Sequence, residues 1–128
     1  MSVEATDRKT RDILSDWRFT VLAYCLPIAA IAATGTPSIA EDWRTAIWSA
    51  ACAVMGVACL INARRCGRVH CYFTGPFFLA IALITLLFGA GLLPLGANGW
   101  NLIGLALLVG GVVLTFGPEL VFGKYRRR

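Results

Sequence analysis

The sequence predicts an all-α integral membrane protein: a four-helix bundle with both termini in the cytoplasm. Hydrophobic residues make up 58% of the 128-residue chain, charged residues make up 15%, and the mean hydropathy is +0.70. A soluble domain carries roughly 25% charged residues, so this chain lacks the polar surface that a globule in water needs. Four long apolar runs, each near the roughly 20 residues that cross a bilayer, predict four spans in a single membrane domain over residues 1–128.

The N-terminal residues 1–18 are mostly charged and polar, with Ile13 and Trp17 at helical spacing. This pattern favours an interfacial segment with Trp17 at the lipid headgroups over a helix that binds a partner protein. The first span is predicted over residues 19–34. Pro27 lies inside it and is expected to kink the helix, because proline cannot donate the usual backbone hydrogen bond.

The second and third spans, over residues 43–62 and 75–93, flank a polar stretch at residues 62–76. We expect this stretch to be a short loop at the membrane surface, since it interrupts two apolar runs. Thr74 is predicted as the N-cap of the third span, with Pro76 in its first turn, because both residue types are favoured at those positions.

The fourth span is predicted over residues 102–122, followed by a basic tail at residues 123–128. Membrane-spanning strands are excluded for all four runs. None of them alternates apolar with polar residues, and open sheet edges cannot face lipid.

The distribution of Lys and Arg predicts the orientation. Four lie in the N-terminal segment, three in the polar stretch and four in the tail, whereas Arg44 alone lies on the other side. Basic residues gather at the cytoplasmic ends of spans, so both termini and the polar stretch are expected in the cytoplasm of a bacterium, with the chain in its inner membrane. The net charge of +5 therefore does not indicate nucleic-acid binding, which favours a basic face with interleaved aromatic residues.

The polar stretch concentrates groups that bind soft metals. Cys66, His70 and Cys71 supply two thiols and one imidazole within six residues. Structural disulfides are uncommon in a reducing cytoplasm, and the neighbouring arginines favour the thiolate form. Two sulfur ligands and one imidazole suit Zn(II), Cu(I) or a similar thiophilic ion such as Hg(II).

Three further cysteines lie within the predicted spans. Cys52 and Cys59 precede Cys66 at intervals of seven residues, so all three line one side of a helix, with a drift of about 20° per heptad. They form a candidate relay for an ion, to which Cys25 in the first span also belongs. The alternative is that the span cysteines act as small apolar residues in helix packing.

Glu119 lies near the predicted cytoplasmic end of the fourth span. An acid in a span is a functional candidate, because its charge is costly in lipid. At this shallow depth, an interfacial ion pair with Arg64, Arg65 or Lys124 explains it equally well.

The chain resembles the bacterial mercury-resistance transporters of the inner membrane in its size, its four spans and its placement of cysteines. Those proteins pass Hg(II) between cysteine pairs and deliver it to a cytoplasmic reductase. Their first span carries a pair of cysteines, where this chain has Cys25 alone. The stretch at residues 66–76 also resembles one in small uncharacterised bacterial membrane proteins, and that second resemblance implies no function.

The sequence therefore predicts a carrier or transport accessory for a thiophilic ion, with Hg(II) or Cu(I) as the expected cargo. No Ser/His/Asp set and no phosphate-binding glycine loop is present in the sequence, so we do not expect an enzyme. A homodimer or a cytoplasmic acceptor protein is the expected partner. One alternative is a non-catalytic accessory or assembly protein whose basic loop binds a partner, and another is a redox sensor. The expected metal ligands are Cys66, His70, Cys71 and Cys59, and the expected relay residues are Cys25, Cys52 and Glu119.

Overall fold

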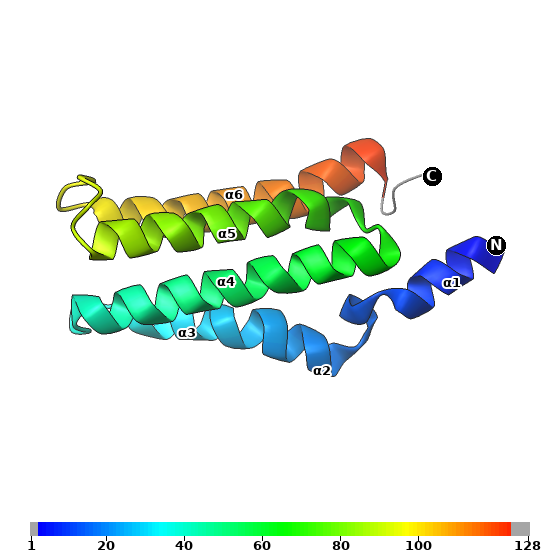
Figure 1. Cartoon of the computed structure of the whole chain (residues 1–128), viewed down its shortest axis with the longest axis horizontal. Coiled ribbons are helices and arrows are strands. Elements are labelled where there is room, and N and C mark those ends of the chain that lie inside the picture. The colour runs from blue at the N-terminus through cyan, green and yellow to red at the C-terminus, as the bar shows by residue number, and fades with distance from the viewer. Residues whose placement is uncertain (1–2, 124–128) are drawn as a thin grey trace.

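The computed structural model describes residues 3–123 of the chain (Figure 1). This part contains four helices that are long and apolar enough to cross a membrane, and it contains no strand. The prediction of an all-α four-helix membrane bundle is thereby confirmed. Of the predicted basic tail, residues 124–128 lie outside the described residues. The four segments are Trp17–Thr34, Glu41–Cys66, Val69–Gly89 and Gly99–Phe122.

The chain enters the bundle through two short helices, α1 (Val3–Arg11) and η1 (Ile13–Ser15). An ion pair between Asp7 and Arg11, one turn apart at 3.3 Å, supports the exposed surface of α1. Asp12, between the two helices, is buried with 4% of its surface exposed. The N-terminal segment is therefore fixed to the bundle by at least one inward-facing charge.

The first span is one continuous helix with a π-helical turn. It consists of α2 (Trp17–Thr20), the π-helical η2 (Val21–Cys25) and α3 (Leu26–Thr34). Pro27 follows the π-helical turn and has no N–H to offer the carbonyl of Ala23. Regular α-helical pairing is consequently interrupted near the predicted kink, and a π-turn is a common form of such an interruption.

The polar stretch expected to be a loop is almost entirely helical. Helix α4 (Glu41–Cys66) runs four residues beyond its predicted end, and α5 (Val69–Gly89) begins six residues before its predicted start. The connector between them is just Gly67 and Arg68. Gly67 has φ 70°, a left-handed conformation that glycine adopts without steric cost and that commonly ends helices. The prediction of an exposed loop over residues 62–76 is therefore wrong.

The predicted start signal of the third span lies inside α5. Thr74 is 1% exposed, and its hydroxyl donates to the carbonyl of His70 at 3.0 Å instead of capping a helix. Pro76 is also in the helix interior. A continuous helix supplies the backbone N–H and C=O groups with hydrogen bonds that lipid cannot provide. This explains why α5 extends through a sequence typical of a helix start. The same helix ends at Gly89, four residues before the predicted boundary.

The other boundaries differ less. Helix α4 starts two residues before the predicted position, at Glu41. Helix α6 (Gly99–Phe122) starts three residues early and ends where predicted. The connector and the C-terminal end of α6 lie at the same end of the bundle as α1 (Figure 1). This end is called the connector end below.

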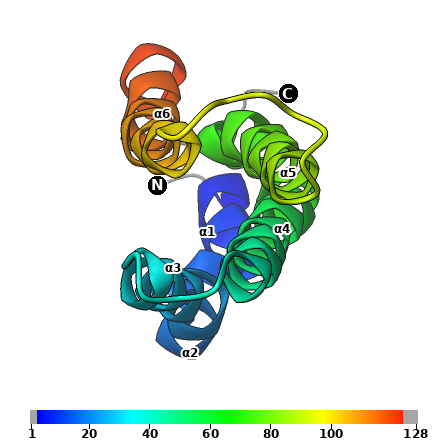
Figure 2. The ribbon, with the colours of Figure 1, turned by 90° about the vertical axis from the view of Figure 1, so that its left-hand side faces the viewer.

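The four spans form an open arc in which each packs mainly on its neighbours in sequence (Figure 2). The most extensive contact joins α4 and α5. It is close because glycines face each other there: a Cβ added at Gly56 would lie 3.0 Å from the carbonyl oxygen of Gly75. The outer helices α3 and α6 do not pack against each other over an extended surface. The arc therefore leaves its inner face open between the first and last spans.

Candidate functional site

A network of polar side chains crosses the connector end of the bundle. Arg68 is at its centre: Nη1 lies 3.0 Å from Asp12 Oδ2, and Nε lies 3.0 Å from Glu119 Oε1. The same Glu119 oxygen is 2.5 Å from His70 Nδ1. One guanidinium thus binds a carboxylate from the N-terminal segment and another from α6, while α5 adds an imidazole. We call this set, with Asn62, the polar network.

Asn62 attaches the N-terminal segment to α4. Its Nδ2 donates to Asp12 Oδ1 at 3.0 Å, and its Oδ1 accepts from the backbone N–H of Ile13 at 3.0 Å. Asn62 is fully buried, so both halves of its amide are satisfied by hydrogen bonds, as burial requires. The turn between α1 and η1 is therefore held directly against the second span.

The local backbone explains how Arg68 reaches both acids. Gly67 reverses the chain, and Arg68 follows with φ −66° and ψ 124° as the residue before α5. Its side chain therefore starts outside both helices, at the end of the bundle. Glu119 lies in the last turn of α6, where the helix dipole disfavours an acid, and the two nearby basic groups compensate for this.

Arg68 keeps its charge despite being half-buried. Burial lowers the pKa of its guanidinium, but the hydrogen bond to Glu119 and the charge of Asp12 raise it by more, so the net shift is upward. The positive charge is consequently a fixed feature of this end of the protein.

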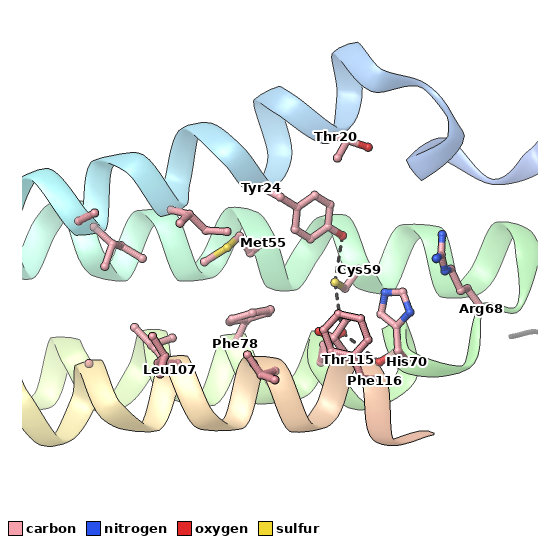
Figure 3. A pocket seen from close by; sticks show the side chains of 18 residues that line it. Thr20, Tyr24, Met55, Cys59, Arg68, His70, Phe78, Leu107, Thr115 and Phe116 are labelled. Atoms are coloured by element: carbon pink, nitrogen blue, oxygen red, sulfur yellow. Dashed lines mark hydrogen bonds between the residues drawn. The ribbon is translucent and has the colours of Figure 1, made fainter. Parts of the chain in front are cut away.

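Two thiols from neighbouring helices meet just inside the polar network. Cys59 of α4 and Cys71 of α5 belong to one buried cluster, and we call them the thiol pair. Cys59 Sγ also lies 3.0 Å from the Tyr24 hydroxyl and 3.3 Å from the Thr74 hydroxyl (Figure 3). Both thiols are buried, with 1% and 0% of their surfaces exposed.

The thiol pair is connected to the polar network through His70. His70 Nε2 lies 3.4 Å from Cys71 Sγ, while its Nδ1 contacts Glu119. If Nδ1 carries the proton and donates it to the carboxylate, Nε2 is free to accept the proton of the thiol. A thiol, an imidazole and a carboxylate in this order form an arrangement that ionises a thiol. The Cys71 thiol therefore has a base within reach.

The structure brings together four of the seven predicted site residues. Cys59, His70, Cys71 and Glu119 form one continuous set of contacts. Cys66 does not join them directly, because its thiol donates to the Asn62 carbonyl at 3.2 Å and the Asn62 amide lies between it and Cys71.

The remaining two predicted residues lie elsewhere. Cys52 is packed in the apolar core beside Trp48 and Met55, and Cys25 is exposed on the outside of the first span. Cys52 therefore has the position of a packing residue and Cys25 that of a lipid-facing residue, and neither touches the thiol pair.

Two expectations about the surroundings of the site are wrong. Cys66 and Cys71 are buried in helices rather than exposed in a wet loop, because α4 and α5 extend to the connector. Glu119 pairs with Arg68 and not with Arg64 or Arg65, which are exposed on the last turn of α4. The third predicted partner, Lys124, lies outside the described residues.

Sequence reasoning missed Tyr24, Asn62 and Asp12 as members of the site. Their contacts join residues 35 to 50 positions apart, so no local spacing predicts them. Asn62 does carry a signal, since it is an amide four residues before Cys66 at the end of an apolar run. Tyr24 and Asp12 carry no such signal. In the sequence, Tyr24 looks like a lipid-facing aromatic residue and Asp12 looks like a surface acid.

A cavity of about 730 Å³ opens next to the site. Cys59, Arg68 and His70 line the end of the cavity nearer the connector, which we call its inner end, and mostly apolar residues of all four spans line the rest (Figure 3). Cys71 is not among the lining residues. The thiol pair is thus approached from the cavity through Cys59, and a bulky substrate could not reach Cys71 without rearrangement.

Within residues 3–123, no group of three or more His, Cys, Asp or Glu side chains is arranged to hold a metal ion. The site offers the two thiols of the pair, with the imidazole held by Glu119. The fold and the site together define a membrane-spanning four-helix bundle with a buried dithiol at one end of an internal cavity. The chain matches no protein-family model, no curated protein and no solved structure.

Proposed function

We propose that this protein carries a thiophilic metal ion, Hg(II) or Cu(I), within the bacterial inner membrane, and that Cys59 and Cys71 bind the ion. The observation that supports this most directly is that these two buried thiols pack in one cluster. Soft ions prefer thiolates, and both Hg(II) and Cu(I) accept two sulfur ligands in a linear arrangement. A structural zinc site requires four ligands, so the same pair is a poorer site for zinc.

Binding of the ion requires that both thiols lose their protons. Each sulfur exchanges one S–H bond for one metal–sulfur bond, so two protons leave per ion bound. His70 Nε2, at 3.4 Å from Cys71 Sγ, is the nearest base for one of them. Glu119 stabilises the imidazolium that forms, since it lies 2.5 Å from the other ring nitrogen.

The proposed direction of transfer follows from the Lys and Arg distribution, which predicts that the connector end faces the cytoplasm. The cavity supplies the route to Cys59 from the membrane interior. Cys66 is one heptad further along α4 and is the next thiol towards the connector. An ion passed from the pair to Cys66, or to a thiol of a cytoplasmic acceptor protein, would remain bound to sulfur throughout.

A second candidate function is that of an accessory protein without a metal. Arg64 and Arg65 are exposed at the connector end, where a basic surface could bind an acidic partner protein. The redox-sensor alternative that pairs Cys66 with Cys71 has less support, because the Asn62 side chain lies between the two thiols.

Titration of the purified full-length protein with Hg(II) and with Cu(I) distinguishes the two functions. We expect one ion per chain, detected as thiolate-to-metal charge-transfer absorption, with an affinity that falls as the pH is lowered because protons compete for the sulfurs. Cys59→Ser and Cys71→Ser should each abolish tight binding. Cys52→Ser is the matched control, since Cys52 is equally buried on α4 but does not contact the pair. Unchanged binding in Cys59→Ser and Cys71→Ser would refute the proposed site, and no binding by the parent protein would favour the accessory function.

A further inference from the structure

The cavity has the composition of a binding site for an apolar molecule with a polar head. Its inner end carries the Tyr24 hydroxyl, the His70 imidazole and the Arg68 guanidinium, whereas Phe78 and Leu107 belong to its apolar part (Figure 3). Its volume of about 730 Å³ lies within the roughly 300–1,000 Å³ of typical small-molecule sites. Polar groups at one end and apolar groups elsewhere are the pattern expected for an amphiphile.

The position of the cavity gives such a molecule access from the bilayer. The lining includes Ile28 of α3 and Val112 of α6, the two helices at the open ends of the arc (Figure 2). These outer helices lack an extended mutual contact, so the cavity lies behind the open side of the arc. A lipid tail can therefore extend between α3 and α6 while the head remains at the inner end.

The charges at the inner end select against an anionic head. Arg68 is the permanent cation there, and Asp12 and Glu119 both bind it at 3.0 Å. A phosphate or carboxylate head would meet a cation that is already neutralised, with Glu119 close by. Arg68 Nη2 makes no hydrogen bond to the described residues and remains available as a donor. The head that fits is uncharged and accepts hydrogen bonds.

We propose that this cavity binds an uncharged lipid whose head carries carbonyl groups, the chemistry shared by quinones and diacylglycerols. The carbonyl oxygens accept hydrogen bonds from Arg68 Nη2 and from the Tyr24 hydroxyl, to which the Cys59 thiol then donates at 3.0 Å. The tail leaves between α3 and α6. The proposal goes beyond metal carriage and does not depend on it, because it involves the cavity and not the ionisation of the thiols.

Two glycines of α6 allow a controlled test. Gly111 lines the cavity, and a Cβ placed there meets only Phe78, at 3.9 Å. The Cβ of a Gly111→Leu side chain is therefore accommodated, and the rest of the side chain takes up cavity volume. Gly117, on the same helix, is not a lining residue, and a Cβ there meets nothing within 4 Å. Gly117→Leu is the matched control, since it makes the same substitution outside the cavity.

The experiment uses the full-length protein in nanodiscs, with three photoreactive lipids that carry a diazirine in the tail. These are a benzoquinone, a short-chain diacylglycerol and a phosphatidic acid, and the readout is the labelled peptide and the apparent affinity. We expect saturable labelling of α3 and α6 by the quinone, the diacylglycerol or both, with phosphatidic acid weaker. Gly111→Leu should reduce the affinity at least about tenfold, and Gly117→Leu should leave it unchanged.

The two uncharged probes show which class of lipid the cavity binds, since the quinone or the diacylglycerol will bind more tightly. Equal or tighter labelling by phosphatidic acid would overturn the proposal, as would the absence of saturable labelling by either uncharged probe. An equal effect of the two leucine variants would also overturn it, because the cavity would then not be the site. Lipid labelling of Cys71→Ser should be unchanged, because Cys71 does not line the cavity, so that failure of lipid binding and failure of ion binding remain distinguishable.

Discussion

Replacement of Glu119 by glutamine tests whether the polar network stabilises the bundle. The substitution keeps the shape of the side chain and removes the negative charge that Arg68 and His70 share. Glu119 Oε1 lies 3.0 Å from Arg68 Nε and 2.5 Å from His70 Nδ1, so two charge-assisted interactions are weakened at once. We expect Glu119→Gln to lower the free energy of unfolding.

The size of the effect follows from these contacts. A hydrogen bond to a charged group contributes about 1.5–3 kcal/mol and a neutral one about 0.5–1.5 kcal/mol, so each weakened bond loses about 1 kcal/mol. The Glu119 side chain is 24% exposed and that of Arg68 is 18% exposed, so solvent screening is partial. Asp12 continues to pair with Arg68 in the variant, which limits the loss. The expected destabilisation is about 1–2 kcal/mol.

The measurement is reversible unfolding in mixed micelles with increasing SDS, followed by tryptophan fluorescence. Glu41→Gln is the control, because Glu41 is an exposed acid in the first turn of α4, where loss of its charge costs about 0.3–1 kcal/mol. A double-mutant cycle with His70→Gln isolates the pair, and we expect a coupling of at least about 0.5 kcal/mol. If Glu119→Gln is no more destabilising than Glu41→Gln and shows no coupling to His70, the reasoning about the polar network is refuted.

Two further predictions concern topology and thiol accessibility. A reporter fused after Arg128 should be active only in its cytoplasmic form, because most Lys and Arg residues lie in the segments that the sequence predicts to be cytoplasmic; activity in the periplasmic form would reverse the orientation. In intact membranes, a water-soluble maleimide should react slowly with Cys59, Cys66 and Cys71, because all three thiols are buried. After unfolding in SDS, the same thiols should react rapidly. Rapid labelling of Cys66 in intact membranes would show that the connector end is more open than the structure indicates.

The fold was largely predictable because membrane spans depend on local composition. Long uncharged runs must be helical in lipid whatever they pack against, so four spans follow from the sequence without tertiary information. The boundaries near the connector did not follow, since polar residues such as Asn62 and His70 suggest a loop when their partners are unknown. Burial of these residues is tolerated because each finds a hydrogen-bonding partner from a distant part of the chain.

The site was predictable in its residue types but not in its pairing. Cysteine and histidine content indicated where chemistry could occur, and Cys59 and Cys71 were both candidates. Their contact depends on the packing of α4 against α5, which the spacing of cysteines along one helix does not reveal. The heptad pattern instead grouped Cys52 with Cys59, whereas in the structure Cys52 lies in the apolar core. Which cysteines meet depends on how neighbouring helices pack, whereas sequence periodicity describes the faces of a single helix.

The polar network also constrains the order in which the protein can mature. Asp12 and Asn62 emerge from the ribosome well before Glu119, so an early intermediate holds Arg68 with one acid and leaves His70 without its carboxylate partner. Since chains fold from the N-terminus during synthesis, insertion of α6 is the event that completes this end of the protein.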